Sequence, residues 1–412
     1  MQQKIAIIGG GASGLMASIT AAENGAEVTI FEHIKPGKKI LSTGNGKCNL
    51  TNLDFKVKDY NTGSPHRLEE CFKRFGVEDT FTFFKGIGLI LREKNGYVYP
   101  YSEQATMVLQ VLLNRINQLG IKTLTEHVCH VGEADRNKPG KRVWLETEDD
   151  KKYYFDSIII ACGSKAAPKT GSDGSGYELT KELGHKLMPV LPSLVQLRCK
   201  DAFCNELAGI RTQVCIHILD GRTEITQESG ELQLTDYGIS GIPVFQLSGL
   251  VNRYLYVNKN ASLLAKIDFM PDMRYDELEN FMKQRIILSS NLSVNELFCG
   301  TLNQKLCKVI LKRAGVKEDM KAKNLSPQML SEILYKFKNF TFLISGSNGF
   351  EQAQVCCGGV DLNEVTDNLE SIYAPHIYFA GEILDVDGRC GGYNLQWAWT
   401  SGYIAGLSAA EK

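Results

Sequence analysis

The stretch KIAIIGGGASGLMASITAAENGAEVTIFE, residues 4–32, decides the fold. Residues 4–8 form a short apolar run that is typical of a strand buried on both faces, and residues 26–31 form a second one. Between them, residues 9–14 follow the pattern G-x-G-x-x-G and open a helix. A strand, a helix and a second strand in this order predict a parallel sheet that is covered on both faces.

The spacing of these glycines is the dinucleotide-binding fingerprint. Gly9 permits a tight turn, Gly11 lets the backbone approach a pyrophosphate, and Gly14 lets the helix pack closely on the strand. The N-terminus of the helix offers N–H groups and partial positive charge to phosphates. Glu32 ends the second strand, where a carboxylate accepts from a ribose hydroxyl and disfavours a 2′-phosphate. The predicted site at this end comprises Gly9, Gly11, Ala12, Ser13, Gly14, Glu32 and His33.

The composition indicates a globular chain. Its 412 residues include 39 glycines, 11 prolines and 43% hydrophobic residues, which excludes collagen and low-complexity disorder. Lys and Arg number 46 against 47 Asp and Glu, so there is no global electrostatic case for nucleic acid or an anionic membrane. Unpatterned cysteines without C-x-x-C, together with the lack of a signal segment or a membrane-spanning run, predict a reduced, cytoplasmic protein. The histidines show no metal-ligand spacing, so no metal is expected.

The change of glycine content and hydrophobic pattern along the sequence predicts a nucleotide-binding domain that is interrupted by an insertion. Residues 1–191 and 336–412 are glycine-rich and form the two segments of that domain. Residues 192–271 alternate in short β-like runs, and 272–335 have a helical, mixed-charge pattern. We expect 192–335 to be a separate, substrate-side domain with a β-rich part and a helical part.

The fingerprint alone does not separate NAD from FAD, but three later segments do. Residues 155–163, FDSIIIACG, resemble the strand-to-glycine segment that ends the first half of glutathione-reductase-type FAD domains. Residues 377–382, IYFAGE, resemble the C-terminal strand whose Gly-acid end holds the flavin ribityl chain. Residues 391–395, GGYNL, then open a final helix, whose N-terminus would stabilise negative charge on a reduced flavin.

Longer strings make the resemblance specific. They include GKKILSTGNGKCNLTN (37–52), NGYVYPYSEQATMVL (95–109) and IYFAGEILDVDGRCGGYNLQWAWTSGYIAG (377–406). With these strings, effectively the whole chain resembles the YhiN/BaiN-type flavoprotein family, also described as aminoacetone-oxidase-family FAD-binding enzymes. The resemblance implies FAD and an α/β fold: a discontinuous, glutathione-reductase-like FAD-binding Rossmann domain with an inserted β-rich plus helical domain. Members are described as reductases of conjugated C=C bonds in steroid-like acids and as amine oxidases.

The resemblance also implies further cofactor-binding residues, position by position. Val128 is expected to meet the adenine through its backbone. The matching residues are Lys39, Thr43, Gly44, Cys48 and Asn49 in the loop along the pyrophosphate and ring; Ala161 and Gly163 in the second nucleotide segment; and Gly381, Glu382, Gly392, Asn394 and Leu395 at the flavin end.

Three side chains are candidates for substrate chemistry. Arg389 begins an R-x-G-G order, residues 389–392, that also occurs in fumarate reductases, where the Arg binds a substrate carboxylate. A guanidinium there suits an anionic substrate. This position departs from the YhiN/BaiN pattern, and a surface charge explains it equally. Tyr393 and Tyr237 are candidate proton donors, or buried hydroxyls that only satisfy the core. Cys48 is either a redox thiol or a packing residue. The adjacent cysteines 356 and 357 form either a strained vicinal disulfide or two free thiols, and the strain favours the thiols.

The leading hypothesis is an FAD-dependent oxidoreductase that moves a hydride from NADH or NADPH through flavin N5 to an activated C=C bond of a small molecule. No second complete fingerprint follows a strand, so the nicotinamide would bind transiently over the ring. One alternative is an amine oxidase that releases peroxide. Another is an RNA-associated flavoprotein that uses the basic residues of 304–323, although the buried face of that segment indicates an ordinary amphipathic helix. The oligomeric state is left open.

Overall fold

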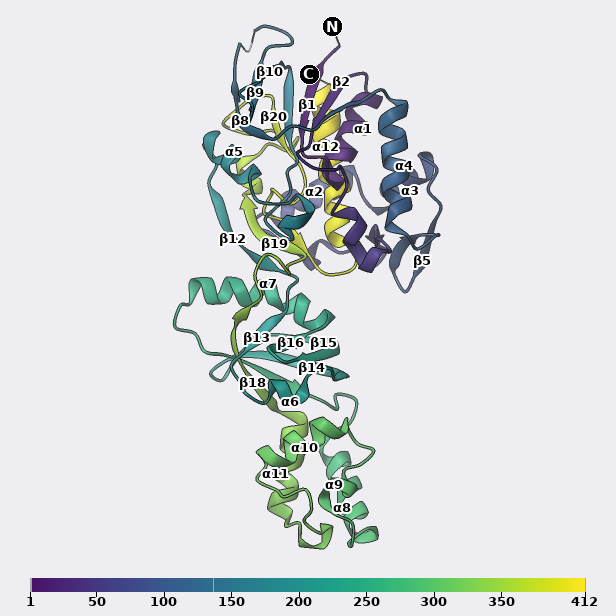
Figure 1. Ribbon diagram of the computed structural model, residues 1–412, viewed down its shortest axis with the longest axis vertical. Helices are drawn as coiled ribbons and strands as arrows, with labels where there is room; N and C mark the ends of the chain where they lie inside the picture. Colours follow the sequence, from purple (N-terminus) through teal and green to yellow (C-terminus); the bar gives the residue numbers. More distant parts are fainter. Residues whose placement is uncertain (1, 136, 412) are drawn as a thin grey trace. The chain divides into compact units, whose positions relative to one another are not determined.

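The computed structural model describes residues 2–135 and 137–411, and it divides the chain into two compact units (Figure 1). Unit 1 consists of Met1–Ser193 and Phe350–Lys412, and unit 2 of Leu194–Gly349. Unit 1 is therefore discontinuous in sequence, with unit 2 inserted into it.

A parallel five-stranded sheet with the order β20-β11-β1-β2-β7 forms the centre of unit 1. The expected strand–helix–strand opening is present, with α1 (Ala12–Glu23) between the first two strands. The five strands are β1 (Lys4–Ile8), β2 (Glu27–Phe31), β7 (Lys122–Leu124), β11 (Ser157–Ile160) and β20 (Ile377–Phe379).

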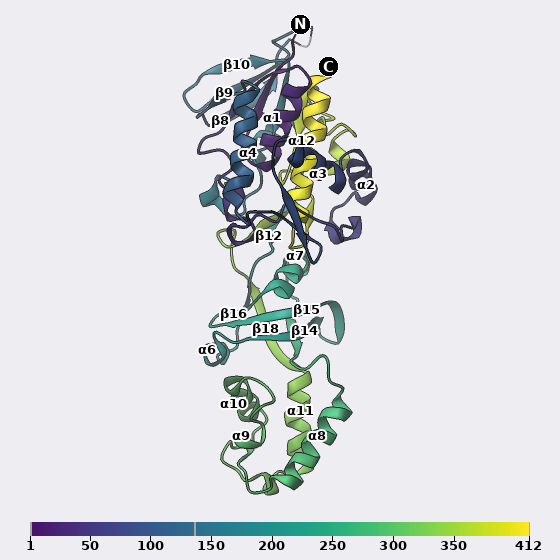
Figure 2. The ribbon, with the colours of Figure 1, turned by 90° about the vertical axis from the view of Figure 1, so that its right-hand side faces the viewer.

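The central sheet is covered on both faces, as its apolar strands require. One face carries Ile5 and Ile7 and packs on α1, α4 (Ala105–Gln118) and α12 (Tyr393–Ala410). The other face carries Ala6 and Ile8 and packs on an antiparallel sheet of β8 (Val128–Glu133), β9 (Val143–Thr147) and β10 (Lys152–Phe155). Figure 1 shows the three helices and the β8–β10 sheet on opposite sides of the central strands, and in the turned view of Figure 2 the helices face the viewer.

Helices α1 and α12 lie side by side because two glycines remove the side chains between them. A Cβ at Gly402 would lie 2.4 Å from the Ser13 carbonyl oxygen, and one at Gly406 would lie 2.5 Å from that of Ala17. The last helix of the chain is thereby held against the helix that follows the fingerprint.

The remaining elements of unit 1 are short strand pairs and peripheral helices. The strands are β3 (Thr51–Asn52), β5 (Leu91–Lys94) and β6 (Tyr97–Pro100) in one small sheet; β4 (Tyr60–Asn61) with β21 (Asp387–Gly388); and β12 (Leu187–Ser193) with β19 (Val355–Val360). The α-helices are α2 (Pro65–Arg74), α3 (Val77–Gly86) and α5 (Gly176–Glu182), and the 3-10 turns are η1 (Ile40–Gly46), η2 (Val57–Asp59), η3 (Pro168–Thr170) and η5 (Leu362–Glu364).

Unit 2 is built on a closed antiparallel barrel with the order β13-β16-β15-β14-β17-β18. Alternate residues of its long strands, such as Val214, Ile216 and Ile218, fill the interior. The barrel strands are β13 (Leu197–Cys199), β14 (Arg211–Asp220), β15 (Thr223–Thr235), β16 (Gly238–Ser240), β17 (Leu263–Asp268) and β18 (Phe340–Ser347).

The structure corrects two details of the sequence-based insertion. The segment 192–271, expected to be β-rich, also contains the sixteen-residue helix α7 (Ile242–Val257), because Pro243 starts a helix whose buried face includes Leu247 and Val251. The insertion was expected to end at 335, yet β18 pairs with β13 and β17 and closes the barrel, so unit 2 extends to Gly349.

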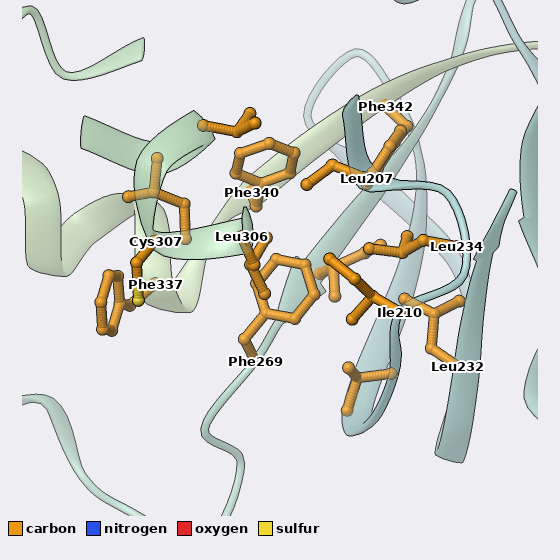
Figure 3. Close-up of a cluster of buried hydrophobic side chains, with 14 of the residues drawn as sticks. Leu207, Ile210, Leu232, Leu234, Phe269, Leu306, Cys307, Phe337, Phe340 and Phe342 are labelled. Atoms are coloured by element: carbon orange, nitrogen blue, oxygen red, sulfur yellow. The ribbon is translucent and has the colours of Figure 1, made fainter. Parts of the chain in front are cut away.

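Helices and the barrel of unit 2 share one apolar core. Figure 3 shows Leu232 and Phe342 from barrel strands in one cluster with Leu207, Leu306 and Phe337 from the helices. The helices are α6 (Cys204–Leu207), α8 (Tyr275–Leu288), α9 (Val294–Leu297), α10 (Gln304–Arg313) and α11 (Pro327–Lys338), with the turn η4 (Ala322–Asn324). Within the described residues, no helix combines the length and apolar character needed to span a membrane.

Candidate functional site

The three fingerprint glycines have different surroundings. A Cβ at Gly9, which has φ of +101°, would lie 2.5 Å from the Ala161 carbonyl oxygen, and a Cβ at Gly14 would lie 1.9 Å from that of Gly9. A Cβ at Gly11 would meet no atom within 4 Å. Gly9 and Gly14 are therefore required by packing, whereas Gly11 borders open space at the start of α1, where a phosphate can approach the backbone.

Glu32 is held rigidly at the end of β2. Its Oε2 accepts from the Gly10 amide at 2.8 Å, and its Oε1 accepts from the Ile34 amide at 3.0 Å. Because each carboxylate oxygen has two lone pairs, both can accept a further hydrogen bond. The fingerprint turn thus fixes the position of the carboxylate predicted to bind a ribose.

Side chains from three segments gather beyond Glu32. The rings of His33 and His127 have centroids 5.1 Å apart, and His33 Nε2 is 4.0 Å from Asp173 Oδ2. Val128 follows His127 at the buried start of β8. The sequence placed His33 and Val128 at the adenine end but missed His127 and Asp173, because neither belongs to the fingerprint.

An ion pair connects distant parts of the predicted flavin site. Lys39 Nζ lies 2.8 Å from Glu382 Oε2, and the Ser164 hydroxyl donates to the same oxygen at 2.8 Å. Ser164 follows the second nucleotide segment, in which Gly163 has φ of +74°. Gly381 is equally constrained, since a Cβ there would lie 2.4 Å from Ser13 Oγ. Three predicted segments thus meet at the start of α1.

The loop that carries Cys48 turns back on itself. Gly44 has φ of +55°, the Thr43 hydroxyl donates to the Ile40 carbonyl oxygen, and Asn49 Oδ1 accepts from the Val98 amide at 3.2 Å. The Cys48 side chain is fully buried, and this burial raises the pKa of its thiol to about 12. A thiol with that pKa stays protonated near neutral pH, which favours packing over a redox function for Cys48.

The same reasoning applies to the adjacent cysteines of β19. Cys356 and Cys357 are both buried, and neither forms a disulfide bond. Burial raises the pKa of the Cys356 thiol to about 11. The packing interpretation is therefore favoured here as well.

The N-terminus of α12 presents unpaired amides. Its cap is Gly392, and the Gln396 amide donates to the Gly392 carbonyl oxygen at 2.9 Å, so the amides of 393–395 precede the intrahelical ladder. Asn394 uses its side chain to hold the preceding turn: Oδ1 accepts from the Gly388 amide and Nδ2 donates to the Gly388 carbonyl oxygen, each at 2.9 Å. Leu395 is half-buried and packs against the core.

A buried hydrogen-bond network that the sequence did not reveal supports this helix. Gln396 Oε1 is the acceptor for the hydroxyls of Thr51 at 2.6 Å and Thr80 at 3.0 Å. Its Nε2 donates to the Gly76 carbonyl oxygen at 3.2 Å and to the Thr400 hydroxyl at 3.1 Å. The network ties β3, which follows the Cys48 loop, to α3 and α12. No motif in the sequence could have found it, because Thr51, Gly76 and Thr80 precede Gln396 by more than 300 positions.

The three candidates for substrate chemistry have separate surroundings. Tyr393 is buried among Phe55 and Tyr60; its hydroxyl donates to the Asp54 carbonyl oxygen at 3.4 Å, and burial raises its pKa to about 12. These contacts favour a core hydroxyl over a proton donor. Tyr237 belongs to unit 2, in the turn between β15 and β16, where the Arg198 guanidinium lies 5.4 Å from its ring centroid. Arg389 is half-buried in the turn that Asn394 holds.

These features fit a dinucleotide of the FAD type. The open space beside Gly11 suits a pyrophosphate, the fixed Glu32 carboxylate suits a ribose, and the unpaired amides of α12 suit the electron-accepting ring. Gly11 and Glu32 follow the carboxyl ends of β1 and β2, and α12 packs on one face of the same sheet. The fold and site thus define an FAD-dependent oxidoreductase.

The comparison with protein families agrees: the model of the HI0933-like protein Rossmann domain matches residues 3–408. The chain belongs to this family, which confirms the resemblance to the YhiN/BaiN-type flavoproteins and the expectation of FAD. It is 39% identical to the 3-dehydro-bile acid delta(4,6)-reductase of Clostridium scindens, covering 99% of both chains. It is 30% identical to the ribosomal RNA dihydrouridine synthase of Haemophilus influenzae, covering 98% of both. A flavocytochrome c3 fumarate reductase structure aligns with all of this chain and 78% of its own at 14% identity and a TM-score of 0.47.

Proposed function

We propose that this protein is an NAD(P)H-dependent reductase that saturates a C=C bond conjugated to a carbonyl group in a small polycyclic acid of the bile-acid type. The observation that carries the proposal is the 39% identity to the bile acid delta(4,6)-reductase over 99% of both chains. Identity at this level along the whole length includes both units, and therefore the substrate-side insertion as well as the cofactor domain.

The overall reaction balances with one reductant. NAD(P)H and one proton are consumed, NAD(P)⁺ is released, and the two carbons of the double bond gain one hydrogen each. When bound, FAD supplies the two-electron carrier between the nicotinamide and the substrate. The name of the ribosomal RNA relative describes an analogous reduction, because the C5=C6 bond of uracil is also conjugated to a carbonyl group.

The residues of the chain would act mainly by holding and orienting. Glu32 and the amides at the start of α1 would bind the ribose and pyrophosphate, and the pair of Lys39 and Glu382 would fix the middle of the cofactor. The amides of 393–395 would favour negative charge at the ring end. Arg389 is proposed to bind the carboxylate of the substrate. Its neighbour Asn394 holds the backbone from which it projects.

An RNA substrate is the second candidate, and the H. influenzae relative is what favours it. The basic segment 304–323 gives it little support. Lys308 pairs with Glu318 at 3.1 Å, and Lys312 pairs with Glu206 at 3.0 Å. The Arg313 guanidinium stacks on Phe203 at 4.5 Å from the ring centroid. Three of the seven cations of this segment thus have partners within unit 2, so the surface available to phosphates is less basic than the sequence indicated.

The proposal predicts that NADPH or NADH rapidly bleaches the flavin of the purified protein in the absence of oxygen. The absorbance of the oxidised flavin is followed after anaerobic mixing with each nucleotide. If either nucleotide bleaches the flavin and small amines release no peroxide in air, the result agrees with the reductase. If neither nucleotide reduces the flavin while amines do, the amine oxidase alternative replaces it.

A further inference from the structure

A pocket of about 150 Å³ lies on the β5–β6 hairpin of unit 1. Lys94 is opposite Tyr97 in the antiparallel register, and Arg92 is opposite Tyr99. Opposed residues of a strand pair lie on one face of the sheet, and alternate residues share that face. Val98, between the two tyrosines, is fully buried on the other face. We call Lys47, Arg92, Lys94, Tyr97, Tyr99 and Glu103 the hairpin face.

The hairpin face is positively charged. Its single carboxylate, Glu103, is shared by Lys47 at 2.8 Å and Arg92 at 2.6 Å. Lys94 has no carboxylate within ion-pair distance among the described residues. The nearby Glu93 is opposite the buried Val98, and its Oε1 accepts from the Gly96 amide in the turn. Three cations therefore face one carboxylate, and an anion would find favourable charge there.

The size and chemistry of the pocket restrict its ligand. A cavity of roughly 150 Å³ holds one six-membered aromatic ring, whereas sites for drug-sized molecules begin near roughly 300 Å³. The pocket is thus too small for a polycyclic substrate body. Aromatic rings beside lysines form the surface on which proteins stack a base and bind its phosphate. Tyr97 and Tyr99 offer the rings, and Lys47 and Lys94 the charges.

The hairpin face adjoins the predicted flavin end on two sides. The Tyr97 ring lies against Gly391, where a Cβ would be 2.5 Å from Cε1, and Asn52 Nδ2 donates to the Gly391 carbonyl oxygen at 2.9 Å. Lys47 immediately precedes Cys48 in the loop assigned to the pyrophosphate and ring. A nucleotide held here is next to both segments that are predicted to surround the flavin.

We propose that the hairpin face binds the nicotinamide dinucleotide, with Tyr99 and Tyr97 stacking one of its rings and Lys47 and Lys94 binding its phosphates. This inference rests on the proposed function, which requires NAD(P)H yet provides no second fingerprint for it. A substrate RNA would offer the same base and phosphate chemistry, so the test must separate the two sources.

The experiment uses the holoprotein and two single variants, Lys94→Met and Tyr99→Leu. Anaerobic stopped-flow reduction at increasing NADPH concentration gives the apparent Kd and the limiting rate. Loss of one charged contact or one stacking partner should raise the apparent Kd about 10-fold. The limiting rate, and the rate at which substrate reoxidises the reduced flavin, should change less than about twofold. Lys85→Met is the matched control, since Lys85 is an exposed lysine on α3 of the same unit.

Each other outcome contradicts the inference. An unchanged Kd for NADPH in both variants shows that the hairpin face does not bind the reductant. If the two variants bind a ribosomal RNA stem-loop more weakly than the wild type but bind NADPH equally well, the hairpin face binds RNA instead. If neither nucleotide reduces the flavin of the wild-type protein, the proposed function fails together with this inference. If NADPH reduces the wild-type flavin but both variants bind NADPH as tightly as the wild type, only this inference fails and the proposed function stands.

Discussion

Gly11→Val should give a folded but colourless protein. Gly11 caps α1 with φ of −74° and ψ of −170°, an extended conformation that valine adopts easily, and a Cβ there meets no protein atom within 4 Å. The added methyl groups would fill the space assigned to the pyrophosphate. We expect FAD affinity to fall by at least about 100-fold, which corresponds to roughly 2.8 kcal/mol. Flavin absorbance per mole of purified protein measures the loss.

Gly86→Val is the matched control for this variant. Gly86 ends α3 in the same unit, and its Cβ would also meet no atom within 4 Å. Both variants should keep the circular dichroism of the wild type, but only Gly11→Val should lose flavin. A yellow Gly11→Val protein with full FAD content would show that the pyrophosphate is not bound at this turn.

Gln396→Met should destabilise unit 1 by about 3 kcal/mol. The substitution keeps the volume of the side chain but removes its hydrogen bonds to Thr80 and Gly76 and leaves the Thr51 hydroxyl without its partner. The Thr80 hydroxyl and the Gly76 carbonyl oxygen keep the hydrogen bond that joins them to each other. Each buried group left without a partner costs about 1–3 kcal/mol. Because Gln396 joins β3 to α12, flavin should also be released at a lower temperature. Flavin fluorescence during heating should show a midpoint lower by roughly 6–10 °C.

Gln110→Met tests whether the loss of stability is specific to the hydrogen-bond network of Gln396. Gln110 is also a helical glutamine, but its Nε2 makes one exposed hydrogen bond, to Asn114 Oδ1 at 2.8 Å. That variant should melt within about 1 °C of the wild type, since exposed substitutions change stability by about 0.5 kcal/mol or less. Equal melting temperatures for Gln396→Met and Gln110→Met would contradict the importance given to the Gln396 network.

The cofactor half of the fold could be predicted because its signals are local. The glycines of the fingerprint and Glu32 lie within one βαβ unit, so their spacing alone determines how they meet. The two FAD-like segments and the final helix were recognisable in the same way, and the family match across residues 3–408 confirms the class of protein.

What the sequence did not reveal depends on contacts between distant residues. The partners of Gln396, Thr51 and Thr80, precede it by more than 300 positions, and nothing in a local pattern links them. For the same reason the sequence assigned β18 to the second segment of the nucleotide-binding domain, 336–412, because only the pairing of this strand with β13 and β17 shows that it closes the barrel. The substrate-contacting side chains, including Arg389, stay predictions.

The most direct test of the account is whether a conjugated steroid acid reoxidises the reduced flavin. The holoprotein is reduced anaerobically with one equivalent of NADPH and then mixed, still without oxygen, with a 3-oxo bile acid that carries 4,6 double bonds. We predict that the absorbance of the oxidised flavin returns in a phase that depends on the substrate concentration and saturates. One C=C bond of the acid should be reduced for each flavin that is reoxidised. A flavin that stays reduced with this acid but is reoxidised by a uracil-containing ribosomal RNA fragment would contradict the small-molecule assignment.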